Sequence, residues 1–155
     1  MANGTDALEI AIKALELGKN SEILVPANTW ISTAEAVLNN NLNIKFVDVD
    51  ETHNISIDDL KKKITKKTKA LIVVHLFGNP ANVYEILKLK KKYNFKLIED
   101  CAQAHGAEFN KKKVSTFGDI GTFSFFPSKN LGCFGDGGCV VTNNKKYFLK
   151  MKKNC

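Results

Sequence analysis

One lysine of this chain lies between two stretches of unusual composition. Lys129 follows the aromatic run 123–126 and precedes a run rich in glycine at 132–138. A lysine held against an apolar wall, close to another cation, loses its proton readily, and the neutral amine can form a Schiff base with a carbonyl compound. Most of the 23 lysines must lie on the surface. Lys129 is therefore a candidate for this chemistry only if other groups support it.

An acidic residue at the end of a predicted strand is the second candidate. Asp100 follows the extended segment 96–99, and small residues and Gln103 come next. A carboxylate in a cleft needs a cationic partner or several hydrogen-bond donors. Asp100 can therefore hold a cationic ring nitrogen. The same residues also fit an ordinary turn, and the local pattern leaves both interpretations open.

A glycine and a hydroxyl residue, Gly4 and Thr5, open the first predicted helix. The unpaired N–H groups and the dipole of a helix N-terminus bind phosphate well. The same motif fits a plain N-cap by Asn3 or Thr5, and by itself it favours that simpler interpretation. The glycine-rich run at 132–138 precedes a strand rather than opening a helix, so it is only a weak dinucleotide signal.

The segments that position these groups alternate between helical and extended patterns. Such repeated β–α units predict an α/β fold, with a mostly parallel sheet and helices on both faces. In sheets of this kind, ligands bind beyond the carboxyl ends of the strands, where Asp100 and Lys129 are expected. Hydrophobic spacing and turn residues predict helices at 5–17, 30–40, 56–67, 80–93 and from 144, and strands at 22–25, 44–48, 69–76, 96–100, 119–126 and 138–142.

The net charge of +7 comes from lysine alone, because the chain has no arginine. Nucleic-acid recognition relies on arginine for base edges and phosphates. The lysines cluster on polar faces of predicted helices or in a loop, so we expect solvated surfaces and no nucleic-acid partner. No apolar run is long enough for a transmembrane helix, and the N-terminus lacks a secretion signal. These features predict a cytoplasmic protein without a membrane partner.

The cysteine pattern indicates neither a metal site nor a disulfide framework. The chain has no C-x-x-C pair, and no histidine lies at metal-ligand spacing from a cysteine. A disulfide scaffold is not expected at this length and cysteine density. We therefore expect no metal, and reduced, mostly buried thiols at Cys101, Cys133, Cys139 and Cys155.

Five blocks of sequence in a fixed order resemble one known family. The chain resembles the DegT/DnrJ/EryC1/StrS family, which are pyridoxal-phosphate (PLP)-dependent sugar aminotransferases of fold type I, like aspartate aminotransferase. Each block is a weak signal, but their order and spacing together are highly specific. The resemblance runs from Gly4 to about residue 152 and rests on GTDAL (4–8), VPANTWISTAEAV (25–37), VVHLFGNPAN (73–82), EDCAQAHGA (99–107) and FSFFPSKNLGCFGDGGCVVT (123–142).

The resemblance implies a role for each group near the cofactor ring. Lys129, in the SFFPSK motif, would bond PLP covalently and then move a proton between the substrate carbon and the cofactor. Asp100 would pair with the ring nitrogen and keep it protonated. Gln103 would donate a hydrogen bond to the phenolic oxygen, and Trp30 would stack on the ring face.

The resemblance also implies a phosphate site at the first helix. Gly4, Thr5 and Ser124 would hold the phosphate together with the backbone N–H of Asp6. The side chain of Asp6 is not proposed as a ligand, because a carboxylate repels phosphate.

The reaction implied by the resemblance is a two-stage transamination. An amino acid, glutamate in this family, would give its nitrogen to PLP, and the aminated cofactor would then aminate a nucleotide-linked keto-sugar. The amino sugar would serve surface polysaccharide or glycan biosynthesis. Relatives that act as dehydratases carry histidine in place of the lysine, so Lys129 argues against that branch.

Family members are more than twice as long as this chain. We therefore expect residues 1–155 to be a single, partial PLP-binding large domain that lacks an N-terminal segment and the small C-terminal domain. The full-length form is expected to be a homodimer whose partner subunit adds a phosphate ligand. One alternative is a truncated, non-catalytic fragment with weak or no PLP binding. A basic nucleic-acid-binding module is a third hypothesis, which the lack of arginine disfavours.

Overall fold

The structure, a computed structural model, describes residues 1–153. Its sheet strands are β1 (Glu22–Pro26), β2 (Asn43–Val47), β3 (Thr68–Val74), β4 (Lys96–Asp100), β7 (Ile120–Ser124) and β8 (Gly138–Val141). Its helices are α1 (Gly4–Ala14), α2 (Ser32–Asn39), α3 (Ile57–Lys63), α4 (Val83–Tyr93) and α5 (Lys145–Lys152), with a 3-10 turn, η1 (Leu76–Gly78). A short hairpin consists of β5 (Glu108–Phe109) and β6 (Lys112–Lys113).

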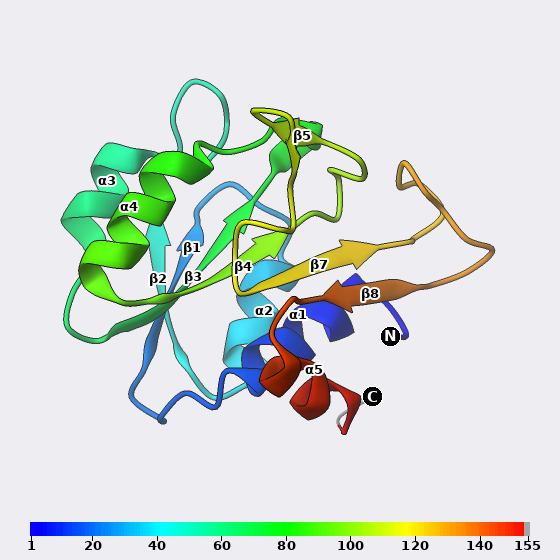
Figure 1. Ribbon diagram of the computed structural model, residues 1–155, viewed down its shortest axis with the longest axis horizontal. Coiled ribbons are helices and arrows are strands. Elements are labelled where there is room, and N and C mark those ends of the chain that lie inside the picture. Colours follow the sequence, from blue (N-terminus) through cyan, green and yellow to red (C-terminus); the bar gives the residue numbers. More distant parts are fainter. Residues whose placement is uncertain (154–155) are drawn as a thin grey trace.

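The six sheet strands have the order β2-β1-β3-β4-β7-β8. The first five run parallel, and β8 pairs antiparallel with β7 at one edge. Helices α3 and α4 cover one face, while α1, α2 and α5 cover the other (Figure 1). The predicted fold class, a mostly parallel α/β sheet with helices on both faces, is confirmed.

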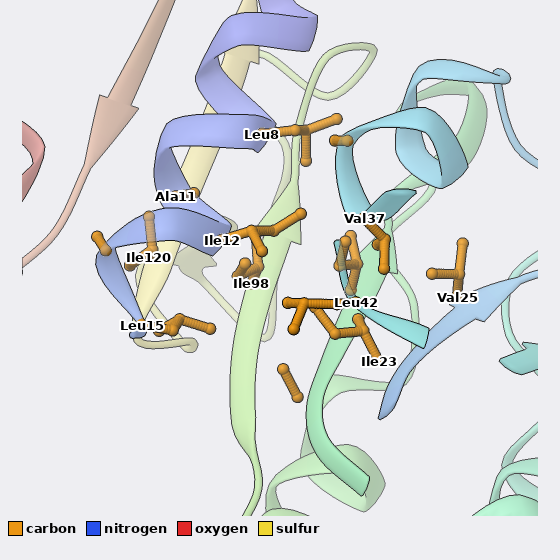
Figure 2. Packing of buried hydrophobic residues seen from close by; sticks show 14 of the residues in the cluster. Leu8, Ala11, Ile12, Leu15, Ile23, Val25, Val37, Leu42, Ile98 and Ile120 are labelled. Carbon is orange, nitrogen blue, oxygen red and sulfur yellow. The ribbon is translucent and has the colours of Figure 1, made fainter. Parts of the chain in front are cut away.

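The strands supply alternate residues to two hydrophobic layers. Ile23 and Leu24 of β1 are both fully buried and point to opposite faces of the sheet. Ile23 packs with Ile12 of α1 and Val37 of α2 (Figure 2). Leu24 packs with Leu60 of α3 in the other layer. Burial on both faces explains why β1 and β3 carry continuous apolar runs, and it places the sheet at the centre of the molecule.

Helix α3 begins as predicted and ends early. The Ser56 side chain accepts a hydrogen bond from the Asp59 N–H and is the N-cap, at the first residue of the predicted range 56–67. The helix ends at Lys63 instead of reaching residue 67, because Ile64 adopts an extended backbone (φ −62°, ψ 130°).

Helix α4 begins three residues later than predicted. Its N-cap is Asn82, whose side chain accepts from the Glu85 N–H. Pro80 therefore lies in the loop before α4 and not in its first turn, where a helix beginning at residue 80 would place it.

Two further local features differ from the predictions. The strand expected at 69–76 ends at Val74, and η1 follows it. The hairpin of β5 and β6 was not predicted at all, because two-residue strands are too short to produce a hydrophobic period.

The thiols do not match the expectation of mostly buried cysteines. Cys101 is buried, but Cys133 is exposed and Cys139 is only partly buried; all three are free thiols. Cys133 lies in the loop after Lys129, where no layer of the core covers it. Cys155 lies outside the described residues. Within residues 1–153, no helix is both long and apolar enough to cross a membrane.

Candidate functional site

A cleft of about 450 Å³ opens at the carboxyl ends of the parallel strands. Strands β4 and β7 end in it, and the N-terminal ends of α1 and α2 border it. Open parallel sheets bind ligands at this edge. Of the eight residues predicted from the sequence, Asp6 alone does not line the cleft; the other seven do, namely Gly4, Thr5, Trp30, Asp100, Gln103, Ser124 and Lys129.

Asp100 is the buried acid of the cleft. Its carboxylate accepts a hydrogen bond from the Ala102 N–H at 3.0 Å and another from the Thr33 hydroxyl at 3.3 Å. Burial raises the pKa of Asp100, and the hydrogen bonds from Ala102 and Thr33 oppose the rise. A cation placed in the cleft would stabilise the ionised carboxylate further.

Thr33, which donates a hydrogen bond to Asp100, was not predicted from the sequence. Thr33 is buried in α2, and its Oγ1 lies 2.8 Å from Oγ1 of Thr29. Because the Thr33 hydroxyl donates to Asp100, Thr29 must donate to Thr33. Both threonines lie in the block 25–37, but only the packing of α2 near the end of β4 brings them to Asp100.

One wall of the cleft is suited to an anion. A Cβ atom on Gly4 would lie only 2.7 Å from the Ser124 Cβ, so glycine is needed for the start of α1 to approach β7 this closely. The Thr5 hydroxyl donates to Ser32 Oγ at 2.8 Å, and Ser124 Oγ accepts from the Phe126 N–H at 3.3 Å. Three hydroxyls and a helix N-terminus in one wall fit a phosphate group. Ser32 was not predicted.

Asp6 does not join this wall. Its backbone N–H donates to Asn3 Oδ1 at 2.8 Å, so Asn3 is the N-cap of α1. At Asp6 the start of α1 is therefore a plain N-cap by Asn3, and the Asp6 N–H already has a hydrogen-bond partner. The side chain of Asp6 lines a different hollow, between α1 and α2.

The amino group of Lys129 lies at the cleft. Within residues 1–153, Nζ of Lys129 makes no hydrogen bond or ion pair, while its backbone N–H donates to the Phe126 carbonyl at 2.8 Å. The loop after it folds back tightly, since a Cβ atom on Gly132 would lie 2.5 Å from the Pro127 oxygen. This turn holds the half-buried lysine at the cleft with its amine available to a ligand.

Gln103 and Trp30 complete the cleft in different ways. Gln103 Oε1 accepts from the Phe77 N–H at 2.7 Å, which leaves its amide nitrogen to donate elsewhere. Trp30 is 74% exposed, so it is not a core tryptophan. Its indole offers an open aromatic face to a planar ligand in the cleft.

A larger hollow of about 630 Å³ lies between α1 and the end of α2. Glu9, Lys13 and Asn40 are among the helix and loop residues that line it, and no strand ends there. The buried carboxylate, the unpaired amine and the hydroxyl-lined helix start all lie in the smaller cleft. Chemistry, and not size, therefore makes the smaller cleft the candidate site.

The fold and the cleft define an α/β protein with a ligand site at the carboxyl edge of its sheet. Residues 1–154 match the model of the DegT/DnrJ/EryC1/StrS aminotransferase family. The chain belongs to this family. The predicted resemblance is thereby confirmed.

Two curated relatives indicate the breadth of the family around this chain. The UDP-N-acetyl-3-dehydro-alpha-D-glucosamine 3-aminotransferase of Acidithiobacillus ferrooxidans is 51% identical over 97% of this chain. The GDP-perosamine synthase of Escherichia coli O157:H7 is 44% identical over 96% of it. In both cases the chain spans 41% of the length of the relative.

Solved structures share the whole described fold. The aminotransferase of Psychrobacter cryohalolentis matches with a TM-score of 0.96 at 40% identity, over 98% of this chain and 39% of that one. The Escherichia coli GDP-4-keto-6-deoxy-D-mannose-3-dehydratase with bound hydrated PLP matches with a TM-score of 0.90 at 40% identity, over 95% and 39%. NtdA of Bacillus subtilis, with the cofactor PMP bound, matches with a TM-score of 0.90 at 33% identity, over 97% and 34%.

Proposed function

We propose that the protein containing this chain is a PLP-dependent aminotransferase that converts a nucleotide-linked keto-sugar into an amino sugar, with glutamate as the amino donor. The single observation that carries the proposal is the cleft itself. It brings together an unpaired lysine, a buried carboxylate and an anion-binding helix start from segments that are far apart in the sequence. Family membership and the PLP or PMP named for solved relatives support it.

The residues of the cleft fit PLP group by group. Gly4, Thr5 and Ser124 form the wall that suits its phosphate. Asp100, whose pKa burial raises, needs the cation that a protonated ring nitrogen would supply. Lys129 lines the cleft and offers an amine that makes no hydrogen bond or ion pair within residues 1–153. When bound, PLP supplies an electron sink for the bonds of an amino-group carbon.

The chain's own groups then have distinct tasks. Asp100 would hold the proton on the ring nitrogen, and Thr33 and Ala102 would keep its carboxylate in place. Lys129 Nζ would move the proton to and from the reacting carbon, which requires an amine that is not tied up in an ion pair. Trp30 would cover one face of the ring and limit the access of water.

The substrate class comes from the relatives. Curated relatives of 44–51% identity are transaminases or synthases of UDP-, GDP- and dTDP-linked sugars, by their names. We extend this class, and its use in polysaccharide or glycan biosynthesis, to the protein that contains this chain. The cytoplasmic location and the single partial large domain predicted from the sequence remain parts of the proposal.

We also propose that the full-length form is a homodimer. Large apolar side chains are exposed at the mouth of the cleft and in the loop that follows Lys129, namely Trp30, Phe126, Leu131 and Phe134. An exposed apolar group of this kind is typical of a protein interface. Sedimentation equilibrium of the full-length form should give twice the mass of one subunit. A full-length form that is monomeric at micromolar concentration would contradict the dimer.

The cofactor assignment can be tested on this chain directly. PLP followed by borohydride should fix the label on the peptide that contains Lys129, and Lys129→Ala should abolish that label. Lys145→Ala, which changes a surface lysine of α5, serves as the matched control and should retain the label. Label spread over other lysines, with no loss in Lys129→Ala, would remove Lys129 from the site.

The reaction class needs a second measurement. Glutamate added to the PLP-loaded protein should release 2-oxoglutarate and replace the visible band of PLP by that of PMP. The same test should be repeated on a form with the full length of the relatives. If both forms bind PLP and neither converts it to PMP, transamination is contradicted and a non-catalytic binding role is favoured.

A further inference from the structure

A buried histidine–glutamate pair lies beside the cleft. His75 and Glu99 are both fully buried, and His75 Nε2 lies 3.1 Å from Glu99 Oε2. The other ring nitrogen, Nδ1, accepts from the backbone N–H of Ala81 at 3.1 Å. An imidazole nitrogen that accepts a hydrogen bond carries no proton, so the proton lies on Nε2 and is donated to Glu99.

Glu99 is held in place by three backbone donors. Ser115 N–H donates to Oε2 at 2.9 Å, while Phe117 N–H and Gly118 N–H donate to Oε1 at 2.8 and 2.6 Å. With His75, each carboxylate oxygen accepts two hydrogen bonds. The position of the Glu99 carboxylate is therefore fixed from several directions, and it fixes the tautomer of His75 in turn.

The loop 76–81 depends on this histidine. The His75 ring bonds to Ala81, so it joins the start of the loop to its end. Phe77 within the loop has a left-handed backbone (φ 56°), which is unfavourable for a residue with a side chain. Its side chain is 73% exposed and gives the loop little packing. A loop of this conformation persists only where surrounding groups hold it.

Asn54 is the second group that holds the loop. Its Oδ1 accepts from the Leu76 N–H at 3.3 Å, and its Nδ2 donates to the Asn79 carbonyl at 3.2 Å. His75 and Asn54 thus clamp the loop from two sides, and both are buried. The Phe77 N–H of this loop donates to Gln103 Oε1 at 2.7 Å, which joins the loop to a residue that lines the cleft.

We propose that His75 and Glu99 are positioning residues for Gln103. They hold the loop 76–81 so that the Phe77 N–H engages Gln103 Oε1, and the side-chain nitrogen of Gln103 is left to donate to an oxygen of the ligand in the cleft. The inference rests on the proposed PLP site for the identity of that oxygen, which is the phenolic oxygen of the ring. The hydrogen-bond chain itself does not depend on the ligand.

The first test uses the unmodified chain without cofactor. Nitrogen-15 NMR of the histidine rings should show His75 as a neutral imidazole with its proton on Nε2 and an unprotonated Nδ1. A proton on Nδ1 would remove the bond from Ala81 and overturn the proposal. Because no residue is changed, loss of folding cannot obscure the result.

The second test compares two replacements of the histidine by amide hydrogen exchange. His75→Gln retains a donor towards Glu99 but loses the acceptor for Ala81, and exchange at Ala81 and Phe77 should accelerate about tenfold or more. His75→Asn places an oxygen near the former Nδ1 and should restore much of the protection. Asn144→Ala removes the N-cap of the distant α5 and is the control for general destabilisation. Equal acceleration in His75→Gln and in this control would overturn the proposal.

The third test reads the cleft itself. Gln103→Leu should shift the visible absorption band of bound PLP, because it removes a donor to the ring oxygen, and His75→Gln should shift the band in the same direction. A shift in Gln103→Leu with an unchanged band in His75→Gln would overturn the positioning role. If the unmodified chain gives no PLP band, the proposed function fails, while the tautomer and exchange results still decide the hydrogen-bond chain.

Discussion

The two neighbouring acids at the end of β4 have opposite surroundings. Glu99 is fully buried and accepts hydrogen bonds from His75 and three backbone N–H groups. Asp100 is also buried, but it accepts only from Ala102 and Thr33 and lines the cleft. Successive strand residues point to opposite faces of a sheet, so one strand delivers one carboxylate to a structural loop and the next to the site.

The difference shows how burial can serve either structure or chemistry. A carboxylate with a full set of donors is stable in its ionised form and fixes the segments that donate to it. A buried carboxylate with few donors has a raised pKa, as Asp100 has, and it has capacity left for a cationic partner. Asp100, and not Glu99, is therefore the acid that remains available to a ligand in the cleft.

Glu99→Gln should have the largest effect on stability. The amide NH2 would face backbone N–H donors that need an acceptor, and we expect the free energy of unfolding to fall by about 3 kcal/mol. Urea denaturation measures the change. Glu108→Gln, at a surface ion pair with Lys113, is the control and should change stability by less than about 0.5 kcal/mol. A loss below about 1 kcal/mol for Glu99→Gln would remove the contrast between the two acids.

A methyl group on the cleft side should have the next largest effect. Gly4→Ala would place its Cβ 2.7 Å from the Ser124 Cβ, so the start of α1 must shift away from β7. We expect a loss of about 1–2 kcal/mol in the free energy of unfolding and a weaker affinity for PLP. In Gly18→Ala, the new Cβ meets nothing closer than Ser21 Oγ at 4.0 Å, so it should be tolerated. Unchanged PLP affinity in Gly4→Ala would show that this wall of the cleft does not hold the phosphate of PLP.

Asp100→Asn should act in the opposite direction to Glu99→Gln. The amide can still accept from Ala102 and can donate to Thr33, and it removes a buried charge that has few donors. We expect the cofactor-free chain to gain on the order of 1 kcal/mol at neutral pH, while a full-length form retains bound PLP and loses most of its turnover. Unimpaired turnover would remove Asp100 from the role of ring partner.

The pH dependence of that gain has a definite sign. Because the pKa of Asp100 is higher in the folded chain than in the unfolded one, the folded state binds more protons between the two values. The stability of the unmodified chain relative to Asp100→Asn is then greatest in acid and falls as the pH rises through the folded pKa. Urea midpoints measured at several pH values test this, and a stability advantage of Asp100→Asn over the unmodified chain that grows in acid would reverse the assignment.

The smallest effect should come from the outer end of the hydrogen-bond chain. Thr29→Val removes the donor to Thr33 but leaves the Thr33 bond to Asp100. We expect a loss of about 0.5 kcal/mol and a further rise in the pKa of Asp100, because Thr33 becomes a poorer donor. The pH profile described for Asp100 should therefore move to higher pH. No movement would show that Thr29 does not affect the carboxylate.

Local sequence determined most of the elements and indicated most of the predicted groups that line the cleft. Continuous apolar runs mark β1 and β3 because both faces of the sheet are covered. The cap at Ser56 marks the start of α3 because side-chain caps act within three residues. The motif around Lys129 and the acid at Asp100 were evident because Asp100 ends one strand of the sheet and Lys129 follows another.

Only the tertiary structure decided which polar groups meet. The bonds of Asp100 to Thr33, of Glu99 to His75 and of Gln103 to Phe77 join segments that are distant in the sequence. Periodicity reports which face of an element is buried, but it carries no information on which strands are neighbours or how a loop returns. The sequence therefore determined that a lysine and an acid would lie at the carboxyl edge of the sheet, and the packing of strands and loops decided which carboxylate remained available to a ligand.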